Sequence, residues 1–61
     1  MNAAAMLDDM PRASLVFLLG QCRIPASPYA SDTTLRGIAR DLHELGTLDA
    51  GEIANEWESL T

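Results

Sequence analysis

The stretch Asp32–Gly46, DTTLRGIARDLHELG, decides the fold class of this chain. Its apolar residues recur three or four positions apart, which is the spacing of one face of an α-helix. They are Leu35, Ile38, Ala39, Leu42 and Leu45. Ser31 or Asp32 can cap the start of this helix, and Gly46 provides the left-handed residue with which many helices end. Gly37 costs up to about 1 kcal/mol relative to Ala inside a helix, so it suggests a close helix crossing.

A further helix begins at Asp49. Asp49 and Glu52 form a capping box, in which the Asp49 side chain accepts from the Glu52 backbone and Glu52 reaches back to the Asp49 N–H. Leu48 and Ile53 fit the accompanying hydrophobic staple. The apolar stripe of this helix comprises Ile53, Trp57 and Leu60, with Ala50 and Ala54. Because the connection is very short, we expect this helix to pack on the preceding one.

The N-terminal half predicts one more helix, over about Pro11–Arg23. Its apolar run 15–19 is also compatible with a buried strand, but the flanking residues extend it past the usual strand length. The prolines at 25 and 28 prevent the helix from continuing, so residues 24–31 form an ordered loop or a hinge. Residues 3–7 either add a short helical turn or fray. The sequence predicts an all-α fold, a small three-helix domain with a short fourth helix at the N-terminus as the alternative to fraying.

Length and composition predict one domain over residues 1–61, with residues 1–10 as the segment open to fraying. The chain is 48% hydrophobic, which favours a packed aliphatic core over disorder. Cys22 is the only cysteine, so no intramolecular disulfide forms, and a reducing, cytoplasmic setting is expected. The start lacks the basic region of a signal peptide, and the apolar runs are shorter than the roughly 20 residues that span a bilayer. We therefore expect no membrane contact.

Charge is distributed unequally along the chain. Residues 41–61 carry six acids and neither Lys nor Arg, whereas all four arginines lie at or before Arg40, and the net charge is −5. The six acids are Asp41, Glu44, Asp49, Glu52, Glu56 and Glu58. Like charges at Glu52 and Glu56 cost roughly 0.2–0.5 kcal/mol across one helical turn, so stability alone does not select this pattern.

Two interpretations of these acids remain open. One is a solvated face that keeps the protein soluble. The other is an electrostatic face for a basic protein partner, because negative charges on successive helical turns imitate a row of phosphates. Tyr29, on the Pro-containing loop, and Trp57 are candidate aromatic anchors at an interface, although a core position is favoured for Trp57.

Arg36, Arg40 and His43 form a stripe on the 32–46 helix, pointing away from its apolar side. They could bind phosphate or an acidic partner. Pairing with nearby carboxylates is favoured, including Glu44 one turn after Arg40.

Other classes of site have little support in the sequence. The short connection before Asp49 invites a helix-turn-helix interpretation, but the following helix carries four acids and no basic side chain. Residues 41–52 resemble the calcium loop of an EF-hand, with Gly46 at its sixth position, yet His43 and Leu45 replace two oxygen ligands. Cys22 and His43 do not form a catalytic or structural zinc set. We expect no enzyme activity, no metal and no cofactor.

Two broader resemblances bear on function. Residues 15–42, a leucine-rich helix followed by an Ile-Pro-x-Ser connection and an amphipathic helix, resemble a SAP-type DNA-binding module. That module binds DNA with basic residues near the connection, but residues 26–34 contain none, so no binding residue carries over. In length and charge the chain is similar to phage or mobile-element inhibitors that mimic DNA, including some anti-CRISPR proteins.

The sequence as a whole predicts a non-enzymatic interaction protein or inhibitor. Its acidic C-terminal surface would dock on a basic, nucleic-acid-handling protein without binding nucleic acid directly. The main alternative is a helical homodimer with structural or regulatory function, burying Leu15, Val16, Phe17 and Trp57 between subunits. The second alternative is a SAP-like or helix-turn-helix nucleic-acid binder.

Overall fold

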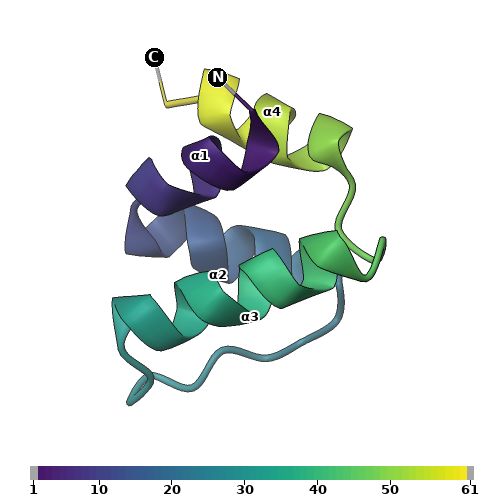
Figure 1. Cartoon of the computed structure of the whole chain (residues 1–61). Helices are drawn as coiled ribbons and strands as arrows, with labels where there is room; N and C mark the ends of the chain where they lie inside the picture. Colours follow the sequence, from purple (N-terminus) through teal and green to yellow (C-terminus); the bar gives the residue numbers. More distant parts are fainter. Residues whose placement is uncertain (1, 61) are drawn as a thin grey trace.

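The computed structural model describes residues 2–60, and these form four α-helices (Figure 1). They are α1 (Ala3–Asp9), α2 (Arg12–Gln21), α3 (Asp32–Glu44) and α4 (Ala50–Glu58). The predicted all-α fold is confirmed. The N-terminal segment does not fray but forms α1, whose Leu7 is fully buried.

Local sequence signals account for the helix starts. The Asn2 side chain caps α1 by accepting from the Ala5 N–H at 2.8 Å. Ser31 caps α3 by accepting from Thr34, and Asp49 caps α4 by accepting from the Glu52 N–H at 2.8 Å. The Asp49 half of the predicted capping box is therefore present. Pro11 is the N-cap of α2. An N–H at this position has no acceptor within the helix, so proline removes no helical hydrogen bond there.

The ends of α2 and α3 share one hydrogen-bond pattern. Two backbone hydrogen bonds close each end. In α2 the Ile24 N–H donates to the Leu19 carbonyl at 2.9 Å and the Arg23 N–H to the Gly20 carbonyl at 3.0 Å. In α3 the Thr47 N–H donates to the Leu42 carbonyl at 2.9 Å and the Gly46 N–H to the His43 carbonyl at 3.1 Å. This is the Schellman arrangement, in which the residue after the C-cap adopts a left-handed conformation. Gly46 occupies that position in α3 with φ +82°, as predicted, and Arg23 occupies it in α2 with φ +63°.

The helices pack in an order that the sequence does not suggest. Helix α1 packs chiefly on α3 and α4, and α2 likewise packs on α3 and α4. Helices joined by the shortest connections, α1 with α2 and α3 with α4, touch only slightly. The prediction that the last helix packs on the preceding one is therefore wrong. Leu48 and Ile53, the staple residues, are both fully buried, and they turn the start of α4 away from α3 toward α1 and α2.

All four helices and two of the connections contribute to one apolar core. Among residues 2–60, nine side chains are buried in it: Leu7, Met10, Leu15, Leu18, Leu19, Leu35, Ala39, Leu48 and Ile53. Trp57 packs against this core and is partly buried. Leu60 lies beyond the end of α4 and is 45% exposed, so it does not continue the predicted stripe.

The predicted close helix crossing at Gly37 is wrong. A Cβ atom at this position would meet no atom within 4 Å, because Gly37 lies on the exposed side of α3. The core-facing side of α3 instead carries Leu35 and Ala39.

Candidate protein-interaction surface

Helix α4 carries four of the acids predicted as partner-binding residues. Asp49 is its exposed N-cap, and Glu58 is its last residue and also exposed. Glu52 and Glu56 are half-buried beside the core-facing residue Ile53. Their α-carbons lie about 6 Å apart along the helix axis, from a rise of 1.5 Å per residue. The Glu56 carboxylate lies 3.5 Å from the Ser59 hydroxyl, which donates to the Glu56 carbonyl at 2.7 Å.

The other two predicted acids lie on the last turns of α3. Asp41 and Glu44 are exposed there, and the turn 45–48 leads from them directly to α4. Figure 1 shows this corner between the end of α3 and the start of α4. The six acids therefore follow the corner and then the length of α4. We call these six side chains the acidic surface.

The structure does not bring Tyr29 to the acidic surface. Tyr29 lies in the loop between α2 and α3, near the start of α3, and α4 lies on the other side of the helices in Figure 1. Its side chain is 96% exposed, as expected for a residue on the Pro-containing loop. Tyr29 and the α4 acids therefore lie at separate places on the molecule.

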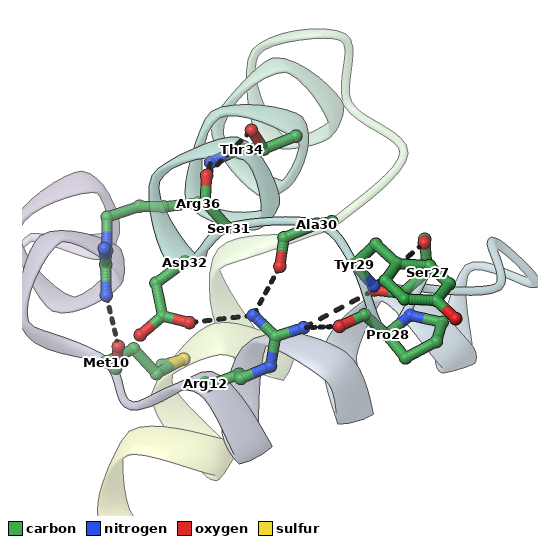
Figure 2. A network of polar contacts seen from close by, with 10 residues as sticks. All are labelled: Met10, Arg12, Ser27, Pro28, Tyr29, Ala30, Ser31, Asp32, Thr34 and Arg36. Atoms are coloured by element: carbon green, nitrogen blue, oxygen red, sulfur yellow. Dashed lines mark hydrogen bonds and ion pairs between the residues drawn. The ribbon is translucent and has the colours of Figure 1, made fainter.

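Arg12 holds the loop that carries Tyr29 (Figure 2). Its Nη1 donates to the Ala30 carbonyl at 2.6 Å and to the Asp32 carboxylate at 2.9 Å. Its Nη2 lies 3.4 Å from the Ser27 carbonyl and 3.5 Å from the Pro28 carbonyl. A planar guanidinium suits this fan of acceptors, since it presents five N–H donors in fixed directions. The loop is therefore ordered by a side chain of α2.

Each residue of the predicted basic stripe binds another part of the same chain. Arg36 donates to the carbonyls of Leu7 at 2.9 Å and of Met10 at 2.6 Å, at the end of α1. The Leu7 carbonyl also accepts from the Met10 N–H at 3.3 Å. Arg40 pairs with Asp8 of α1, so the predicted pairing with Glu44 is wrong. A bond of 2.9 Å joins His43 Nδ1 and the Leu48 carbonyl.

The ion pairs leave the charge asymmetry in place. Within residues 2–60, ion pairs join Arg12 with Asp32 and Arg40 with Asp8. Both acids belong to the first two thirds of the chain, and neither pair includes a member of the acidic surface. These two pairs therefore neutralise acids of α1 and of the start of α3, and neither uses the acids at positions 41, 44, 49, 52 and 56.

Cys22 lies close to the acidic surface. It is the half-buried C-cap of α2, and the nearby Glu52 comes from α4. Burial, and secondarily the Glu52 carboxylate, raise the pKa of the Cys22 thiol above its ordinary value. The thiol is consequently held in its protonated, weakly nucleophilic form.

Comparison of this chain with protein-family models, curated proteins and solved structures finds no match. Within residues 2–60 no group of three or more His, Cys, Asp or Glu side chains is placed to hold a metal ion. The same residues enclose no pocket. None of the four helices has both the length and the apolar character needed to cross a bilayer.

Residues 41–44 of the EF-hand-like segment belong to helix α3, and the Asp49 side chain accepts from the Glu52 N–H as the cap of α4.

The contacts of Arg12 and Arg36 were not predicted. Each is bonded to residues 15 to 29 positions away in the sequence, so no local pattern could have identified them.

Proposed function

We propose that this protein is a non-enzymatic interaction protein whose acidic surface docks on a basic protein. The observation that carries the proposal is that three arginines bind groups outside the acidic surface. Two arginines pair with Asp8 and Asp32, and Arg36 binds backbone carbonyls. The acids of the α3–α4 corner are left to determine the electrostatic field of that end of the molecule.

The arrangement of Glu52 and Glu56 supports a functional role over a merely solubilising one. They are like charges one helical turn apart, and Glu56 lies toward the negative end of α4, which has no basic residue in its last turn. Both features oppose stability. A basic partner would compensate them by supplying the missing cations.

The partner class that best fits this surface is a nucleic-acid-handling protein. Such a protein presents Lys and Arg to phosphates, and carboxylates on successive helical turns offer it an alternative row of negative charges. The function proposed is therefore inhibition by mimicry of nucleic acid, the mode of the phage and mobile-element inhibitors that the chain resembles in size and charge.

The test is affinity capture from a nuclease-treated bacterial lysate with a salt gradient, comparing the native chain with Glu52→Lys/Glu56→Lys. We expect the native chain to retain a basic nucleic-acid-handling protein that elutes as salt rises, and the variant to retain at least tenfold less. The matched control, Ser27→Lys/Thr33→Lys/Asp9→Lys, makes the same total change in charge at exposed positions outside the acidic surface. Circular dichroism checks that both variants remain helical.

Equal capture by the native chain and the Glu52→Lys/Glu56→Lys variant would contradict the proposal. So would loss of capture in the control variant alone. Direct nucleic-acid binding, the second alternative, predicts a gel shift at low salt, which the acidic-surface proposal does not.

A further inference from the structure

We draw no further inference here: the strongest candidate, the exposed side of α2 around Val16 and Phe17, is an unpartnered helix face, and nothing in the structure of residues 2–60 shows what covers it.

Discussion

At the scale of single residues, two glycines of the α3 region differ in whether the backbone conformation requires them. Gly46 adopts φ +82°, a conformation that L side chains rarely tolerate, and it ends α3. Gly37 lies inside α3 with open space beside it and no positive φ. The backbone conformation requires a glycine at position 46 but not at position 37. Gly37 therefore lowers the stability of α3 although nothing around it requires a glycine.

Replacing Gly37 with Ala should therefore stabilise the protein by up to about 1 kcal/mol, the difference in helix propensity between the two residues. Urea unfolding followed by circular dichroism measures it. Gly46→Ala is the paired control and should destabilise by about 1 kcal/mol, because it forces a side chain into the left-handed region. Destabilisation by Gly37→Ala would show that α3 needs a glycine there.

The thiol of Cys22 provides a pH-dependent prediction. Its pKa is raised above the ordinary thiol value in the fold, first by burial and then by the Glu52 carboxylate, so folding favours the protonated thiol. This contribution to stability is complete below the unfolded pKa and is lost as pH rises through the folded pKa. The rate of alkylation by iodoacetamide should accordingly show its inflection at a higher pH than the same measurement on an unfolded Cys peptide. Glu52→Gln should move the inflection down, and Glu44→Gln should not. An inflection at or below the ordinary thiol value in the native chain would contradict this account.

At the scale of elements, α1 is too short to be stable by itself. Isolated helices of fewer than about 12 residues are marginal in water, and α1 has seven. It is held by buried Leu7, by the Arg40–Asp8 pair, and by Arg36 at its C-terminal carbonyls. Of the two polar contacts, Arg36 is the more protected, since it is half-buried while Arg40 and Asp8 are exposed.

Removal of the Arg36 side chain should thus cost more than removal of the Arg40 side chain. Hydrogen bonds to charged groups contribute about 1.5–3 kcal/mol, whereas exposed ion pairs contribute about 0–1 kcal/mol. We expect Arg36→Ala to lower the free energy of unfolding by about 1.5–3 kcal/mol. Arg40→Ala should lower it by about 0–1 kcal/mol. Hydrogen exchange should show the loss of protection concentrated in α1 for Arg36→Ala. Equal effects of the two substitutions would mean that Arg36 does not hold α1 in place.

At the scale of the whole molecule, the core depends on residues from both ends of the chain. Leu7 and Met10 near the N-terminus and Ile53 near the C-terminus belong to the same buried cluster. Sixty-one residues bury only about 60% of the surface that the unfolded chain exposes, so each core side chain accounts for a large share of the stability.

Leu7→Ala should destabilise the protein by about 2–5 kcal/mol, the range for deletion of a buried leucine side chain. In a domain this small, that loss is expected to unfold a substantial fraction of the molecules at room temperature. Leu45→Ala is the control, because Leu45 is 78% exposed and its loss should change stability by less than about 0.5 kcal/mol. Thermal unfolding by circular dichroism gives both values. A change below 1 kcal/mol for Leu7→Ala would show that α1 does not complete the core.

The sequence by itself determined the features that depend on neighbouring residues. Helical periodicity predicted α3, the Asp49 cap predicted the start of α4, and Gly46 predicted the end of α3, because each signal acts within one or two helical turns. The acids at residues 41–58 could also be identified, and their exposed or half-buried positions follow from the same periodicity.

Only the tertiary structure decided which helices pack together and which arginines remain at the surface. The short turn before Asp49 suggested that α4 packs on α3, yet burial of Leu48 and Ile53 sends α4 onto α1 and α2. Arg36 finds its acceptors 26 and 29 residues away, at Met10 and Leu7. Such contacts depend on burying apolar surface from the entire chain at once, and that balance has no signature in a local stretch of sequence.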